Sequence, residues 1–94
     1  MAQILYTNAV TVTTGATQIL ASNKDAEFRQ ITNGAAVLYL GGDSGVTTAT
    51  GYIMAASATL TMAGGDDRHS GLYSGALWGR ATTGTITVRT LEAQ

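Results

Sequence analysis

The alternation of threonine with apolar residues constrains the fold of this chain more than any other feature. It runs over residues 10–14 near the start, over 58–62 in the middle and over 83–90 near the end. Successive side chains of a β-strand point to opposite faces, so a period of two places the apolar side chains on a core. The threonines then face water or a neighbouring surface. The pattern predicts an all-β protein.

Glycine marks the ends of these segments and divides the chain into short strands. Twelve of the 94 residues are glycine and none is proline. We predict a small antiparallel β-sandwich, or a barrel-like sandwich, of about seven or eight short strands in a single domain over 1–94. A helix over 16–26 or over 52–63 is the alternative, but the first would be poorly capped and glycines bracket the second. The predicted strand segments are 4–14, 17–21, 28–32, 35–40, 52–54, 58–62, 76–82 and 85–91, with a short edge segment over 46–51.

Asn33 and Gly34 give the strongest local signal, because both residue types tolerate the positive φ of a type I′ hairpin turn. A two-residue turn at this point would pair Gln30 with Val37. One face of the hairpin would then carry Phe28, Val37 and Tyr39, and the other would carry Ile31, Leu38 and Leu40. Such a two-sided apolar hairpin is either central between two layers or lends one face to another subunit.

A second hairpin is predicted for segments 76–82 and 85–91, with its turn at Thr83-Gly84. This pairing would set Trp78 opposite Arg89. Cross-strand neighbours of this kind suit cation–π stacking.

The composition argues against a catalytic site and against nucleic acid or a membrane as a partner. Charged residues make up 12% of the chain, with one histidine, no cysteine and a formal net charge of -1. A balance of this kind offers no electrostatic attraction for nucleic acid or an anionic membrane. No apolar run approaches the roughly 20 residues of a membrane span, and the N-terminus lacks the features of a signal peptide. The sequence predicts a protein made in the cytoplasm, with no nucleic-acid or membrane partner.

Two short motifs could be taken for reactive sites. Residues 42–45, Gly-Asp-Ser-Gly, match the run around the nucleophile of chymotrypsin-like proteases, but the single histidine follows the serine instead of preceding it. The cluster Asp66, Asp67, Arg68 and His69 lacks the alternating ligand spacing of a cation site. We therefore predict no catalytic residues, no metal site and no cofactor, and we interpret the cluster as a solvated loop that can contact a partner.

The aromatic residues leave two interpretations open. Tyr39, Tyr52, Tyr73 and Trp78 could form a sugar-binding platform, because aromatic rings stack on sugar faces. Rings at alternating strand positions more often belong to a core, and we favour that interpretation.

Read end to end, the order of these features resembles small tailed-phage virion proteins, namely capsid decoration (cement) proteins and head-fibre-like proteins. The segments that carry the resemblance are 11–21, 29–34, 37–41, 46–52, 72–73 and 84–92. The chain departs from the family at Ala55-Ala56-Ser57, where such sequences commonly turn with Pro-Gly.

The resemblance implies a β-sandwich without enzymatic activity that binds the outer surface of an assembled capsid and bridges its subunits. The implied partners are the major capsid protein and further copies of the chain, as a dimer or trimer, and the implied location is the virion surface. A glycan-binding head-fibre or a tail or neck adhesion module is the alternative. Our candidate contact residues are Arg29, Ile31, Leu38 and Leu40 of the hairpin and Asp66, Asp67, Arg68 and His69 of the loop.

Overall fold

The fold is all-β, as the sequence predicts. The computed structural model describes residues 5–24, 26–63 and 75–93. No helix in these ranges is long and apolar enough to cross a membrane. The strands are β1 (Leu5–Val12), β2 (Thr17–Leu20), β3 (Phe28–Thr32), β4 (Leu38–Gly41), β5 (Tyr52–Met54), β6 (Thr59–Ala63), β7 (Leu77–Ala81) and β8 (Ile86–Ala93).

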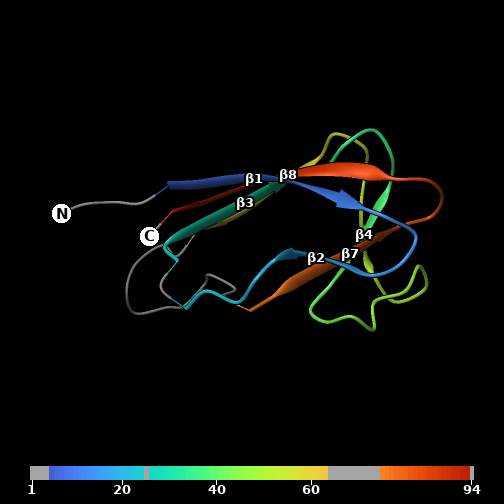
Figure 1. Cartoon of the computed structure of the whole chain (residues 1–94), viewed down its shortest axis with the longest axis horizontal. Coiled ribbons are helices and arrows are strands. Elements are labelled where there is room, and N and C mark those ends of the chain that lie inside the picture. Colours follow the sequence, from blue (N-terminus) through green and yellow to red (C-terminus); the bar gives the residue numbers. More distant parts are fainter. Residues whose placement is uncertain (1–4, 25, 64–74, 94) are drawn as a thin grey trace.

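The strands form two four-stranded antiparallel sheets. Sheet A has the order β1-β8-β3-β6, and sheet B has the order β2-β7-β4-β5. In Figure 1 the strands β1, β8 and β3 run along the upper part of the molecule, with β2 and β7 below them. The predicted β-sandwich is confirmed, and its extents of 43 × 22 × 18 Å make it distinctly elongated.

The core lies between the two sheets and follows the predicted alternation. On β8, Ile86 and Val88 are buried while Thr87 and Arg89 are exposed. The remaining buried apolar side chains of the core cluster are Val12, Ile19, Leu20, Ile31, Leu38, Leu40, Met54, Leu77 and Ala81. Burial of a valine, leucine or isoleucine side chain contributes about 1.5 to 3 kcal/mol to the free energy of unfolding. This small set therefore supplies most of the hydrophobic stabilisation of the fold.

The core covers only part of the length of β1. Val12 is fully buried and Val10 packs against the core cluster, whereas Tyr6 and Asn8 on the same face are exposed. Sheet B contributes short strands that lie opposite the Val12 end of sheet A, and β1 extends beyond them. The period of two therefore identifies which side chains share a face, but not how far the opposing sheet reaches.

The predicted hairpin at Asn33-Gly34 is wrong. β3 pairs with β6 and β8 in sheet A, whereas β4 pairs with β5 and β7 in sheet B. Residues 33–37 therefore carry the chain from one sheet to the other. Among the described residues only Ser57 and Gly84 have positive φ, so the type I′ geometry does not form at Asn33-Gly34.

The Asn33 side chain explains why a crossover replaces the hairpin. It is buried, and its amide Nδ2 donates to the carbonyl oxygens of Ala36, Met54 and Ala55 at 2.7, 3.2 and 2.9 Å. Its Oδ1 accepts from the Gly34 N–H at 2.7 Å. These bonds tie the crossover to the end of β5, so the residue that signals a turn instead fixes a link between sheets.

The predicted hairpin across Thr83-Gly84 is also wrong, although both of its strands exist. β7 belongs to sheet B and β8 to sheet A, so Trp78 pairs with Gln18 and Gly41 rather than with Arg89. The predicted cation–π contact is absent because Arg89 lies across from Ala9 and Thr32. Gly84, in the connection between β7 and β8, has a positive φ of 66°.

The predicted edge segment over 46–51 is a turn. Thr47 closes it, since its hydroxyl accepts from the N–H groups of Ala49 and Thr50 and hydrogen-bonds with the Thr50 hydroxyl. Threonine here satisfies backbone groups locally, which favours a turn over a strand. Val46 is buried and packs onto β4 at Gly41, where a Cβ would lie 2.6 Å from the Val46 Cβ.

Candidate interaction surfaces

The four candidate contact residues of the supposed hairpin lie inside the molecule. Arg29, Ile31 and Leu38 have no exposed surface, and Leu40 is 5% exposed. The three apolar side chains fill the core between the sheets. A contact role for them stays a prediction, but in a single chain they offer a partner almost no surface.

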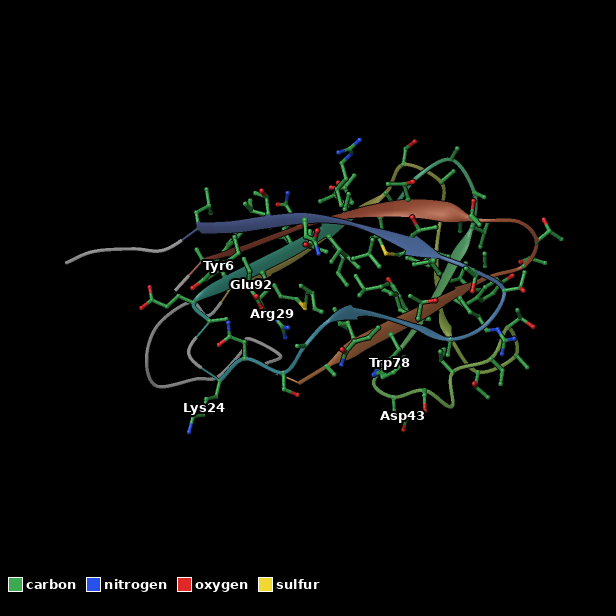
Figure 2. All side chains as sticks on the ribbon, in the orientation of Figure 1. Tyr6, Lys24, Arg29, Asp43, Trp78 and Glu92 are labelled. Carbon is green, nitrogen blue, oxygen red and sulfur yellow. The ribbon has the colours of Figure 1, made fainter. Side chains whose placement is uncertain are left out.

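Arg29 ties the interior of sheet A to its covering loops. Its Nε donates to Glu92 Oε2 at 2.6 Å, its Nη1 to the Gly75 carbonyl at 2.8 Å and its Nη2 to the Ala21 carbonyl at 2.6 Å. Figure 2 shows Arg29 and Glu92 on neighbouring strands at one end of the sheet. A buried guanidinium is tolerated when its donors are paired in this way. Arg29 is therefore a structural residue.

The other four candidates, Asp66, Asp67, Arg68 and His69, lie outside the described residues. Within those that are described, no three acidic, histidine or cysteine side chains come together in a way that could hold a metal ion. The motif at 42–45 forms an exposed turn in which the Gly45 N–H donates to Asp43 Oδ1 at 2.8 Å. The Asp43 side chain accepts a hydrogen bond from the backbone of its own turn, which is typical of aspartate in turns.

The aromatic side chains are divided between surfaces. Tyr52 is 65% exposed at the edge of sheet B, whereas Tyr39 and Trp78 are half-buried. Tyr52 pairs with Leu40, and Trp78 pairs with Gly41, so the two rings belong to opposite faces of sheet B. They do not form one coplanar platform, and the predicted core role holds only in part. Tyr73 lies outside the described residues.

Loop 42–51 covers much of the outer face of sheet B. Arg80, on that face, donates through Nη1 to the Val46 carbonyl at 3.3 Å and through Nε to the Thr14 carbonyl at 3.0 Å. These bonds hold two loops against β7. With Val46 buried beneath the loop, the exposed apolar side chains of this sheet lie toward its β5 edge, at Tyr52, Ile53 and Val37.

A groove opens between β5 and β6, the edge strands of the two sheets. Its volume is about 340 Å³, and no lining side chain is charged. The lining residues are Leu40, Gly41, Gly42, Tyr52, Leu60, Met62 and Leu77. Met62 and Leu77 also flank, in sequence, the segment 64–74 that lies outside the described residues.

The outer face of sheet A is broader and is formed by the alternate residues of β1, β8, β3 and β6 that point away from sheet B. We call this surface the threonine face, after Thr7, Thr11, Thr32, Thr59, Thr61 and Thr87. Two hydrogen bonds join its side chains, one between the Thr32 and Thr59 hydroxyls at 3.3 Å and one from Thr61 to Gln30 at 3.2 Å. In Figure 1 no labelled strand covers this side of β1 and β8.

Arg89 is the one charged residue among the described side chains of the threonine face, and it is exposed. The period of two could have identified it, since Arg89 shares the parity of Thr87. The predicted hairpin instead paired Arg89 with Trp78, which placed it in a cation–π contact.

When the chain is compared with protein-family models, with curated proteins and with solved structures, none of them matches it.

Proposed function

We propose that the protein is a structural component of a tailed-phage virion that binds the outer surface of the assembled capsid and stabilises it by bridging major capsid subunits. The single observation that supports this proposal best is the threonine face, a broad sheet surface with one charge among its described side chains and none of the described strands over it. Protein interfaces are typically depleted of lysine, glutamate and aspartate, whereas arginine is enriched there. The order of sequence features that resembles decoration proteins supplies the identity of the partner.

Stabilisation in this proposal is a linkage effect. A protein that binds the assembled shell and not its free subunits shifts the equilibrium toward assembly. A shell repeats the same surface many times, so modest contacts at each site are sufficient. Catalysis has no part in this function.

The proposal includes self-association as a dimer or trimer through the edge of sheet B. Ile53 and Tyr52 are 63% and 65% exposed on adjacent positions of the edge strand β5. An edge strand presents unpaired backbone groups that can bond to another strand. Exposed apolar side chains beside such an edge favour contact between copies.

The test is binding of the purified protein to capsid shells that lack it. Shells are mixed with increasing protein, sedimented, and analysed for bound protein and for their melting temperature. We expect saturable co-sedimentation and a higher melting temperature of the shells. Protein that stays in the supernatant at all concentrations, with unchanged shell melting, would refute the proposal.

A further inference from the structure

We infer that the threonine face is the surface that docks on the shell, and that its partner presents a carboxylate to Arg89. This inference rests on the proposed function for the identity of the shell. It goes further in naming one face of the sandwich, the chemistry of the surface opposite it and the residue that orients the contact.

The size of the face suits a protein interface. With strands about 4.8 Å apart and outward residues about 6.8 Å apart along each strand, the face covers about 460 Å² in projection. Its accessible area is larger because side chains stand out from the sheet. The face can therefore supply most of the roughly 800 Å² that each partner buries in a standard interface.

Covering the small side chains of the threonine face costs little side-chain conformational entropy. Threonine and alanine have short side chains and lose less rotamer freedom on contact than lysine or glutamate would. The hydroxyl pairs Thr32–Thr59 and Thr61–Gln30 already satisfy part of their hydrogen-bonding capacity within the face. A partner surface that covers the face must supply hydrogen-bond partners to the remaining hydroxyls, those of Thr7, Thr11 and Thr87.

Arg89 lies at an interior position of this face. β8 is flanked by β1 and β3, and Arg89 stands between Ala9 and Thr32 in the cross-strand row. Among the described residues its guanidinium makes no hydrogen bond or ion pair. Covering it without a partner would leave a buried unpaired charge, which is strongly unfavourable. A surface that covers the face must therefore bring an acceptor, and a carboxylate fits the guanidinium best.

A second copy of the chain is a poor occupant of the face. Face-to-face packing about a two-fold axis would enclose two Arg89 side chains in one interface, and the face carries no carboxylate to compensate them. Like charges enclosed together in an interface are strongly unfavourable. This separates the threonine face, for the shell, from the β5 edge, for copies of the chain.

The experiment compares two matched pairs of variants in the shell co-sedimentation assay. Arg89→Glu reverses the charge on the face, and Lys24→Glu makes the same change at an exposed residue on the opposite side of the molecule. Thr7→Arg adds a bulky side chain to the face, and Thr48→Arg adds it to the exposed loop over sheet B. We expect R89E and T7R to bind at least about tenfold more weakly than wild type, and K24E and T48R to remain within about twofold.

Each outcome separates the inference from the proposed function. If wild type binds shells and R89E and T7R bind equally well, the docking face is wrong while the proposed function stands. If wild type does not bind, the proposed function fails.

If K24E weakens binding as much as R89E, binding depends on general electrostatic attraction, and the specific contact of Arg89 is overturned. If R89E or T7R changes the sedimentation coefficient of the free protein, a second copy occupies the face and the inference is overturned. Thermal melting of every variant establishes that it is folded.

Discussion

At the scale of single residues, Arg29 and Arg89 show how burial decides the role of one side-chain type. Arg29 is fully buried and gives its donors to Glu92 and two carbonyls, whereas Arg89 is exposed on the threonine face. Residue type and membership of a β-strand do not distinguish them. The difference lies in parity, because Arg29 shares the inward face with Ile31.

Removal of the Arg29 side chain should destabilise the protein severely. Arg29→Ala leaves Glu92, whose side chain is 14% exposed, without its cation, and breaks the bonds to the Ala21 and Gly75 carbonyls. We expect a loss of about 3 to 5 kcal/mol in the free energy of unfolding, measured by urea denaturation. Arg29→Lys should lose less, because it keeps the charge, and Arg89→Ala should change stability by at most about 0.5 kcal/mol. Equal effects of R29A and R89A would contradict the structural role of Arg29.

Gly34 offers a second test, because an added Cβ would lie 2.6 Å from the Thr87 carbonyl oxygen. That atom belongs to the backbone of β8, so the crossover and the strand would have to separate. Gly34→Ala should cost about 1 to 3 kcal/mol of stability. Gly15→Ala is the matched control, since its Cβ would meet the Thr13 hydroxyl at an ordinary 3.7 Å. It should be neutral or slightly stabilising, as glycine replacement is at compatible positions; a G15A loss equal to that of G34A would refute the close approach.

At the scale of elements, the chain changes sheets at nearly every connection. Only β4 and β5 are both consecutive in sequence and paired. In sheet A, β8 pairs with β1 and β3, and β3 pairs with β6, so every strand pair of this sheet joins segments that are far apart in the chain. Asn33-Gly34 and Thr83-Gly84 both signal local turns, and both instead serve crossovers.

The features of the fold that depend on neighbouring residues can be predicted from the sequence, whereas those that depend on contacts between distant residues cannot. The alternation of threonine predicts the strands, and glycine predicts their ends, because both act through the conformation of neighbouring residues. Sheet membership depends on contacts such as those of Asn33 with Met54 and Ala55, which no short window contains. The prediction that Ile31 and Leu38 contact a partner followed from the wrong pairing. Because β3 and β4 belong to different sheets, both side chains lie in the core between those sheets.

Engineered cysteines test the pairing directly, because the natural chain contains none. Thr11 and Thr87 are cross-strand partners in β1 and β8, so the T11C/T87C variant should form a disulfide on mild oxidation. Gln30 and Val37 would be partners only in the hairpin, because Gln30 lies in β3 of sheet A and Val37 lies at the end of the crossover to sheet B. The Q30C/V37C variant should remain reduced, as measured by thiol titration and electrophoretic mobility. A disulfide in Q30C/V37C but not in T11C/T87C would overturn the topology.

At the scale of the whole molecule, the proposed function assigns separate roles to separate surfaces. The threonine face lies on one side of the sandwich, loop 42–51 covers the other, and the exposed edge of β5 lies along one flank. Under the proposed function, a single copy would contact a shell and a neighbouring copy at the same time. In such an arrangement, contacts between copies strengthen binding through avidity.

The most direct test of this account is a cryo-electron microscopy reconstruction of shells saturated with the protein. The account predicts additional density at symmetry-related positions on the outer surface, with β1, β8, β3 and β6 against the shell and a capsid carboxylate within hydrogen-bonding distance of Arg89. Saturated shells without added density would contradict the proposed function, and density with sheet B against the shell would contradict the docking face.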